Sequence, residues 1–246
     1  MDDHALAAYL ATVTGDALVD LRTQGMVGRE LKDGGDRSAH ELLLRLLEEH
    51  RPADAVLSEE GHDDRRRLTS RRVWIVDPVD GTREYADPPR VDWAVHVALW
   101  EDGDLVAGAV AQPGLGTTFS TADPPVVPAS TSARPRIAVS RTRRPAFVTA
   151  LAEEIDAELV PMGSAGAKAM AVVRDVADAY VHGGGQYEWD SAAPVVVARA
   201  AGLHASRADG SPLLYNQPDL WLPDLCVCRP ELADTINSFV RSHSAA

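Results

Sequence analysis

The sequence has few cysteines, no excess of positive charge and no long hydrophobic run. Cys226 and Cys228 are the only cysteines among 246 residues; they are too few and too close together for a disulfide framework, and two thiols alone make no zinc site. No apolar segment approaches ~18 residues, the minimum for a membrane-spanning helix, and the N-terminus does not resemble a signal peptide. We therefore expect a cytoplasmic, soluble protein without a membrane partner.

The charge balance is acidic. There are 24 lysines and arginines against 37 aspartates and glutamates, which gives a formal net charge of −13 at pH 7. This balance argues against a nucleic-acid backbone or an anionic membrane as the main partner. An acidic protein that binds a phosphorylated small molecule usually needs a metal ion between the two negative charges. The chain is also long enough to bury a substantial core.

The hydrophobic pattern of the first half predicts two helices and then an antiparallel sheet. Helical periodicity predicts a first helix at residues 4–22, with Gly25 as its stop signal. Ser38 and Glu41 have the spacing of a capping box, which predicts that a second helix begins at Ser38 and ends before Pro52. Three predicted strands follow, at residues 73–76, 93–100 and 105–110.

The second half has a different rhythm. Residues 122–135 lack periodicity and are rich in proline, serine and threonine, which is typical of a boundary. We therefore predict an N-terminal α+β lobe at 1–134 and a C-terminal α/β lobe at 135–246. In the second lobe, short strands alternate with helices. The strands are predicted at 136–139 and 179–181, and the helices at 145–155, 168–176 and 191–201.

The segment WIVDPVDGT predicts a strand that ends in two aspartates, Asp77 and Asp80. Pro78 fixes its own φ and pushes Asp77 out of the helical region, so we expect a stiff turn in which the two carboxylates converge. Convergent carboxylates repel each other unless a cation lies between them, and hard oxygen ligands favour Mg²⁺. The alternative is an acidic turn at the surface without a ligand.

Two further segments place acids at the ends of predicted elements. Glu59 and Glu60 follow a short apolar strand, so a sheet could bring them close to Asp77 and Asp80. Asp190 comes immediately before a predicted helix, at or near its N-cap, where a carboxylate either caps the helix or binds a metal. The two roles are compatible, because one oxygen can cap while the other coordinates. By contrast, His96 alternates with core-facing valines and is predicted to pack in the sheet.

The motifs SEE, WIVDPVDGT and WDSAAP, in this order, resemble the inositol monophosphatase superfamily of Mg²⁺-dependent, lithium-sensitive phosphatases. The segments VSRTR, GSAGAKAMAVV and DAYVHGGGQYEWDSAAP resemble its CysQ branch, the bisphosphate nucleotidases. The resemblance covers nearly the whole chain. It implies a layered αβαβα sandwich of the inositol monophosphatase and fructose-1,6-bisphosphatase type, with the active site between two lobes and commonly a homodimer.

The resemblance also implies roles for individual residues. Two or three Mg²⁺ ions would be held by Glu59, Asp77, the backbone carbonyl of Val79, Asp80 and Asp190. The attacking water would be positioned by Glu59, Thr82 and Asp36. The phosphate would lie against the backbone N–H groups of Gly81 and Thr82. Further substrate contacts fall on Ser140, Arg141, Ser164, Lys168 and Asp190. Two metals could clamp the attacking and leaving oxygens, so no side-chain nucleophile is needed.

The resemblance implies removal of the 3'-phosphate of 3'-phosphoadenosine 5'-phosphate, a by-product of sulfate assimilation. An inositol-1-phosphate or fructose-1,6-bisphosphate phosphatase would use the same chemistry, and a phosphometabolite-binding protein without catalysis is a more distant alternative. A haloacid-dehalogenase-type phosphatase is disfavoured, because in D-x-x-D the two acids cannot both lie on one face of a continued strand. Two positions depart from the branch: His182 stands where many relatives carry arginine, and GSAGAK is one residue longer than usual.

Overall fold

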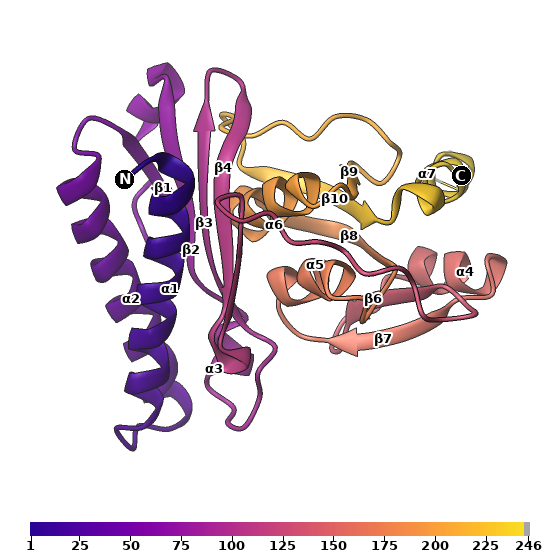
Figure 1. Ribbon diagram of the computed structural model, residues 1–246, viewed down its shortest axis with the longest axis horizontal. Coiled ribbons are helices and arrows are strands. Elements are labelled where there is room, and N and C mark those ends of the chain that lie inside the picture. The colour runs from indigo at the N-terminus through magenta and orange to yellow at the C-terminus, as the bar shows by residue number, and fades with distance from the viewer. Residues whose placement is uncertain (244–246) are drawn as a thin grey trace.

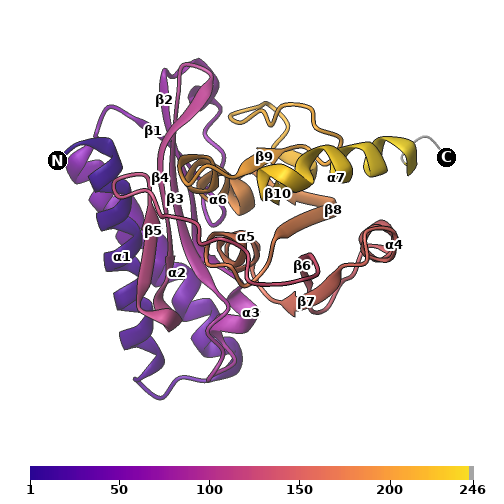
Figure 2. The ribbon, with the colours of Figure 1, turned by 45° about the vertical axis from the view of Figure 1, so that its right-hand side comes forward.

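A computed structural model describes residues 1–243 and shows five layers, helix, sheet, helix, sheet and helix (Figure 1). This confirms the predicted αβαβα sandwich. None of the helices within residues 1–243 is both long and apolar enough to cross a membrane. The outer helices are α1 (Asp3–Arg22) and α2 (Gly28–His50) on one side, and α4 (Ala146–Glu154) and α7 (Pro230–His243) on the other. The middle layer contains α5 (Ala165–Val173) and α6 (Glu188–Ala200). Figure 2 shows these two helices nearly end-on between the sheets.

The first sheet contains five strands in the order β1-β2-β3-β4-β5. Their bounds are β1 (Ala55–Ser58), β2 (Arg72–Asp80), β3 (Ala94–Glu101), β4 (Asp104–Gln112) and β5 (Thr117–Ser120). Strands β2 to β5 pair antiparallel, as predicted for the first three of them, whereas β1 runs parallel to β2. Because parallel strands end at the same edge of a sheet, the residues after β1 lie beside the end of β2. Short helices follow β2 and β4, and one precedes β2: α3 (Thr82–Tyr85), η2 (Pro113–Leu115) and η1 (Arg65–Thr69).

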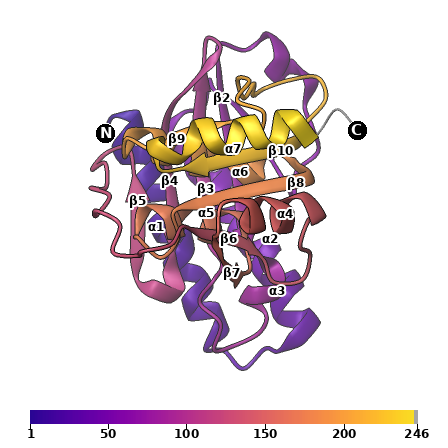
Figure 3. The ribbon, with the colours of Figure 1, turned by 90° about the vertical axis from the view of Figure 1, so that its right-hand side faces the viewer.

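The second sheet is mixed and has the order β7-β6-β8-β10-β9. Its strands are β6 (Arg136–Ser140), β7 (Glu158–Met162), β8 (Ala179–Tyr187), β9 (His204–Ser206) and β10 (Trp221–Cys228). Strand β6 is parallel to β7 and β8, and β10 is antiparallel to β8. Figure 3 looks onto this sheet with α4 and α7 in front of it. The two cysteines are buried in β10 as free thiols.

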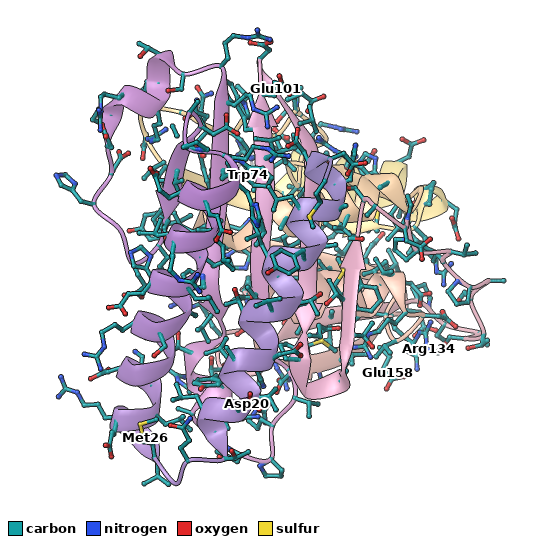
Figure 4. All side chains as sticks on the ribbon, turned by 60° about the vertical axis from the view of Figure 1, so that its left-hand side comes forward. Asp20, Met26, Trp74, Glu101, Arg134 and Glu158 are labelled. Atoms are coloured by element: carbon teal, nitrogen blue, oxygen red, sulfur yellow. The ribbon has the colours of Figure 1, made fainter. Side chains whose placement is uncertain are left out.

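The alternating side chains of the first sheet enter two different cores. Val95, Val97 and Leu99 pack with leucines of α1 and α2, whereas Ala94 and Ala98 pack with residues of α5 and α6. Figure 4 shows Trp74 on the sheet between α1 and α2, and its side chain is fully buried there. The sheet is therefore covered on both faces, which explains why β2 and β3 are apolar almost throughout.

Helix α2 begins ten residues before the predicted start. The structure places Ser38 inside the helix, which starts at Gly28, so the interpretation of Ser38 as a cap was wrong. Two consecutive glycines within this stretch hid the helix, because glycine disfavours helix interiors. A Cβ atom at Gly35 would come within 2.3 Å of the Tyr85 ring, so glycine allows α2 to pack against α3. A tertiary contact thus overrides local propensity.

The two predicted lobes share the middle layer. Helix α6 belongs to the second half of the sequence, yet its valines pack with Ala98 and Val110 of the first sheet. Residues 121–135 form neither helix nor strand, as expected of a connection. The boundary at residue 134 remains a prediction, because the hydrophobic core is continuous across it.

A buried carboxylate joins this connection to the second sheet. Asp178 is 3% exposed and accepts hydrogen bonds from Arg136 Nε at 2.9 Å, Arg229 Nε at 2.9 Å and Ser130 Oγ at 2.9 Å. Burial by itself would raise the pKa of Asp178, but these donors hold that pKa at about 2. The charged carboxylate therefore stabilises the fold above pH ~4, and this contribution is lost as the pH falls towards 2.

We expect Asp178→Asn to lower the free energy of unfolding by about 1.5–3 kcal/mol, because Arg136 and Arg229 lose one of the two carboxylates that they share and keep only Asp175. Urea unfolding at neutral pH measures the change. Asp156→Asn is the matched control: Asp156 pairs with Arg134 at 2.5 Å, but both side chains are exposed, so the loss should stay below about 1 kcal/mol. Equal losses in the two variants would show that burial of the Asp178 network contributes nothing.

Candidate metal and phosphate site

The ends of β1 and β2 bring two carboxylates together. Glu59 follows β1, and its N–H donates to the Val76 carbonyl at 3.3 Å, directly before Asp77. The Glu59 carboxylate lies close enough to Asp77 to raise the pKa of that carboxyl group, after the larger effect of burial. This confirms the prediction that two acidic strand ends meet at one edge of the sheet.

A bulge in β2 adds Asp80 to the same place. The predicted stiff turn after Asp77 is absent; β2 continues to Asp80, and its register against β3 shifts between the two acids. Asp77 pairs with His96 and Asp80 with Ala94, so three steps on β2 match two on β3. The extra residue brings two acids at D-x-x-D spacing back to one face of a continued strand. The sequence argument against this arrangement failed because it assumed a regular strand.

Asp190 completes a cluster of three acids. Oxygen atoms of Asp77, Asp80 and Asp190 lie within 4.8 Å of one another, a grouping that could hold a metal ion. Helix α6 begins at Glu188, so Asp190 is its third residue rather than the predicted N-cap. Its Oδ2 accepts a hydrogen bond from the N–H of Tyr187, the actual N-cap, at 2.6 Å. The other oxygen remains available for a ligand, as the two compatible roles require.

Three acids of this region hold their protons more tightly than usual. Burial, followed by the carboxylates of Glu59 and Asp80, raises the pKa of Asp77 well above its ordinary value. Burial also raises the pKa of Asp190 to about 7, and Asp80 adds to this shift. The Glu59 side chain is open to solvent at the cavity wall. Partial desolvation by the surrounding protein, followed by the nearby carboxylates of Glu60 and Asp80, still raises the pKa of Glu59. Such crowding of carboxylates costs free energy that a cation would relieve.

Asp80 behaves in the opposite way. Its Oδ1 accepts from the N–H of Ala165 at 3.0 Å, and its Oδ2 accepts from the N–H of Gly166 at 2.6 Å and from the Ser164 hydroxyl. These donors form the N-terminus of α5, where the helix dipole favours an anion. Burial alone would raise the pKa of Asp80, but His96, the Ser164 hydroxyl and the Lys168 ammonium group hold it at about 2. Asp80 therefore stays charged inside the cluster.

His96 is a residue of the site that the sequence reasoning assigned to packing. Its Nε2 lies 3.1 Å from Asp80 Oδ2, and its Nδ1 lies 3.0 Å from the Trp189 carbonyl oxygen. A Cβ atom at Gly166 would approach His96 Nε2 to 2.1 Å, so glycine is required there. A role for His96 in the site could have been inferred from its position on β3, the strand that pairs with β2, which carries Asp77 and Asp80. The prediction that His96 only packs was incomplete for this reason.

A cavity of about 850 Å³ opens beside the cluster. Most of the predicted site residues line it, namely Glu59, Asp80, Gly81, Thr82, Ser140, Arg141, Ser164, Lys168 and Asp190. Cationic side chains from α2, α3 and the end of β6 also line it, namely Arg29, Lys32, Arg83, Arg141 and Arg143. The cavity wall therefore carries carboxylates from the ends of β1 and β2 and from the first turn of α6, and cations from α2, α3 and the end of β6.

The predicted pair that positions water is not joined directly. Thr82 donates its hydroxyl hydrogen to the Val79 carbonyl at 3.3 Å, and no hydrogen bond links it to Asp36 within residues 1–243. Asp36 lies on α2, where burial and the nearby Glu60 carboxylate raise its pKa to about 6. Asp36 also acts electrostatically on Glu59, so all three predicted residues belong to the same region.

The two predicted substrate contacts that carry a positive charge, Lys168 and Arg141, already have protein partners. Lys168 Nζ donates to the Gly163 carbonyl at 3.2 Å and also to the Ser164 carbonyl. The ammonium group therefore holds the turn that presents Ser164 to Asp80, and burial lowers its pKa. Arg141 Nη2 lies 2.7 Å from Glu84 Oε1, but the Arg141 side chain remains 38% exposed. Arg141 is thus the more accessible of the two cations.

Comparisons with known proteins agree with this geometry. The profile of the Inositol monophosphatase family matches residues 29–245. A curated 3'-phosphoadenosine 5'-phosphate phosphatase of Mycobacterium leprae is 50% identical, with 98% of this chain and 94% of the relative covered. The 3'(2'),5'-bisphosphate nucleotidase CysQ of Escherichia coli K12 is 31% identical over 76% of this chain and 80% of its own. The crystal structure of inositol monophosphatase-II from Staphylococcus aureus superposes with a TM-score of 0.82 at 22% identity, covering 98% of this chain and 96% of that one.

We expect Asp77→Asn to stabilise the metal-free protein and to abolish its stabilisation by Mg²⁺. The amide removes a crowded carboxylate, and a pKa raised by one unit corresponds to about 1.4 kcal/mol. Its oxygen can still accept the N–H of Val79, which lies 3.0 Å from Asp77 Oδ1. Thermal melting with a chelator and with millimolar Mg²⁺ measures both effects. Asp20→Asn, an exposed change on α1 (Figure 4), should alter neither value. An undiminished Mg²⁺ shift in Asp77→Asn would remove Asp77 from the ligand set.

Gly166→Ala should destabilise the protein by about 1–3 kcal/mol and weaken the Mg²⁺-induced rise in melting temperature. The new methyl group would overlap His96, which is buried and held by the Trp189 carbonyl, so α5 must move away from Asp80. The control is Gly34→Ala in α2, where the nearest atom is Met26 Sδ at an ordinary 3.6 Å. That change should stabilise the helix by about 0.5–1 kcal/mol. Similar unfolding curves for both variants would contradict the proposed contact.

Proposed function

Because the chain belongs to the inositol monophosphatase family, we propose that it is a metal-dependent phosphomonoesterase that removes the 3'-phosphate of 3'-phosphoadenosine 5'-phosphate to give AMP and phosphate. The observation that carries the proposal is the convergence of three acids, two of them buried, beside a cavity that also exposes cations. The proposal includes two or three Mg²⁺ ions, a homodimer in the cytoplasm and a role in clearing a by-product of sulfate assimilation.

The donor set fits a hard divalent cation. Asp77, Asp80 and Asp190 supply carboxylate oxygens, with Glu59 and the Val79 carbonyl beside them. No histidine or cysteine ligand is present in the cluster, which favours Mg²⁺ over softer metals. Bound Mg²⁺ would neutralise the crowded carboxylates and polarise the phosphoryl oxygens. The raised pKa values of Asp77 and Asp190 support this assignment, because their charged forms need a cation.

The surrounding residues would orient the reactants. Glu59 and Asp36 have raised pKa values, so either carboxylate can accept a proton from an attacking water more readily than an ordinary surface acid. We propose that Thr82 helps to place this water, after its hydroxyl turns away from the Val79 carbonyl. Gly81 and Thr82 line the cavity directly after Asp80, where their N–H groups can hold the phosphate. These residues position groups and transfer protons, and no side chain forms a bond to phosphorus.

The cations of the cavity favour a substrate with two phosphates. A monophosphate would need only the acid cluster and one set of N–H donors, whereas the wall also carries Arg141 and Arg143 at the end of β6. We assign the second phosphate to Arg141, since Lys168 is already engaged by two carbonyl groups. Inositol 1-phosphate, one of the two alternative substrates, has no second phosphate for Arg141 to bind. The nucleotidase names of the similar proteins support the same choice.

Phosphate release with Mg²⁺ on 3'-phosphoadenosine 5'-phosphate, inositol 1-phosphate and fructose 1,6-bisphosphate tests the proposal. We expect the nucleotide to give the highest kcat/KM. Arg141→Ala should lower this value about tenfold or more relative to its effect on inositol 1-phosphate, because it removes a charge-assisted hydrogen bond. Arg134→Ala, an exposed cation outside the cavity, is the control. A wild-type preference for inositol 1-phosphate would overturn the assignment.

A further inference from the structure

Tyr187, Trp189 and Trp221 form an aromatic cluster at the rim of the cavity, and the proposed reaction assigns no role to it. Tyr187 and Trp189 are stacked with ring centroids 4.8 Å apart, and Trp221 meets Tyr187 edge-on at 5.4 Å. Tyr187 and Trp221 are directly opposite each other on β8 and β10, and both line the cavity. Each is 46% exposed, which is unusual for side chains of this size. The rim therefore presents aromatic surface that the described residues do not cover.

The backbone is adapted to this cluster. A Cβ atom on Gly185 would lie 1.5 Å from Cζ2 of Trp221, so the indole ring occupies the space of a missing side chain. Gly185 also has a φ of +87°, a conformation that favours glycine. Its carbonyl lies 2.9 Å from His182 Nε2, which holds the turn in place. The exposed indole is therefore fixed in position rather than free to fold away.

Gln186 supplies a second, independent sign of a missing ligand. This residue also lines the cavity, is 6% exposed, and neither its Oε1 nor its Nε2 has a hydrogen-bond partner within residues 1–243. A buried amide without partners costs free energy, so native structures rarely keep one without a reason. An amide offers one acceptor and two donors side by side, which matches the polar edge of a purine.

We propose that Tyr187, Trp221 and Gln186 form the subsite for the adenine base, with the aromatic rings stacking on the base and the Gln186 amide turning to bind its polar edge. This inference rests on the proposed function. It assigns a binding site to the base, the part of the substrate that the proposed phosphate contacts do not bind. A flat base has an aromatic face and a hydrogen-bonding edge, and these three side chains offer a partner for each. An inositol ring has hydroxyl groups but no aromatic face on which the rings could stack.

The position relative to the acids suits a nucleotide. Tyr187 is the N-cap of α6, and its N–H donates a hydrogen bond to Asp190. The aromatic cluster therefore begins only three residues, at most roughly 11 Å of extended chain, from the acid cluster. In a nucleoside 3'-phosphate the base lies on the other side of the ribose from the reacting phosphate. The rim of the cavity is therefore where the base would project when the phosphate is at the acids.

Steady-state kinetics of Trp221→Ala provide the main test. We expect kcat/KM for 3'-phosphoadenosine 5'-phosphate to fall about tenfold or more relative to the value for inositol 1-phosphate, mostly through KM, because one stacking contact is lost. Trp221→Phe keeps an aromatic face and should recover most of this loss. Tyr9→Ala, which removes a 38% exposed aromatic ring on α1 outside the cavity, is the matched control and should leave the ratio unchanged.

Gln186→Met separates ligand binding from a structural role. If the amide waits for a base, replacing it by an apolar side chain of similar size should raise the melting temperature and still weaken the nucleotide relative to inositol 1-phosphate. A structural glutamine would instead lower the melting temperature on substitution. A fall in melting temperature with an unchanged substrate ratio would remove Gln186 from the subsite.

Calorimetric titration with AMP keeps the subsite apart from the proposed function. If the wild-type protein prefers inositol 1-phosphate, the proposed function fails, but weaker AMP binding by Trp221→Ala would still support the subsite. If the wild-type protein prefers the nucleotide and Trp221→Ala affects both substrates equally, the proposed function stands and the subsite is overturned. Unchanged AMP affinity in Trp221→Ala overturns it in either case.

Discussion

The carboxylate of Asp80 is the contact on which the arrangement of this protein depends. It leaves the first sheet at a bulge in β2 and accepts hydrogen bonds from the N-terminus of α5, which belongs to the other half of the chain. His96 approaches it from β3. One buried anion thus fixes a strand of the first sheet, a helix of the middle layer and one wall of the cavity. Because its donors are backbone N–H groups and a buried imidazole, the charge persists where a solitary carboxylate would be protonated.

The acids of the cluster are consequently unequal. The protein balances the charge of Asp80 with nearby donors and cations. Asp77 and Asp190 lack such a balance, so their pKa values are raised and their charged forms need a cation. This division reconciles two demands on the site. The fold needs one permanent anion to hold α5, while a metal site needs oxygen ligands whose repulsion is relieved only when the cation binds. A bound metal ion would relieve the repulsion between the Asp77 and Asp190 carboxylates and their acidic neighbours. Its binding would therefore stabilise the folded protein.

Local patterns predicted the parts of the site that depend on neighbouring residues in sequence. Apolar strands followed by acids correctly placed Glu59 and Asp77 at one sheet edge, and alternation predicted β3 and β4 with small errors at their ends. Two of the failures involved contacts distant in sequence. The start of α2 was missed because Gly35 is explained only by the Tyr85 ring. The role of His96 depends on a bulge in β2 and on a glycine in α5, neither of which its own strand reveals.

The first turn of α6 connects the chemistry of the site to its specificity. Asp190 belongs to the acid cluster, and the N–H that it binds is that of Tyr187, whose ring forms the rim of the cavity. A ligand that orders Tyr187 would therefore also order the backbone that orients Asp190. Contacts to a remote part of the substrate can in this way contribute to the reaction at phosphorus, because they fix a carboxylate as well as the ligand. Under the proposed function, the acids and their backbone donors would define the reaction, whereas Tyr187, Trp221 and Arg141, all at strand ends of the second sheet, would select the substrate.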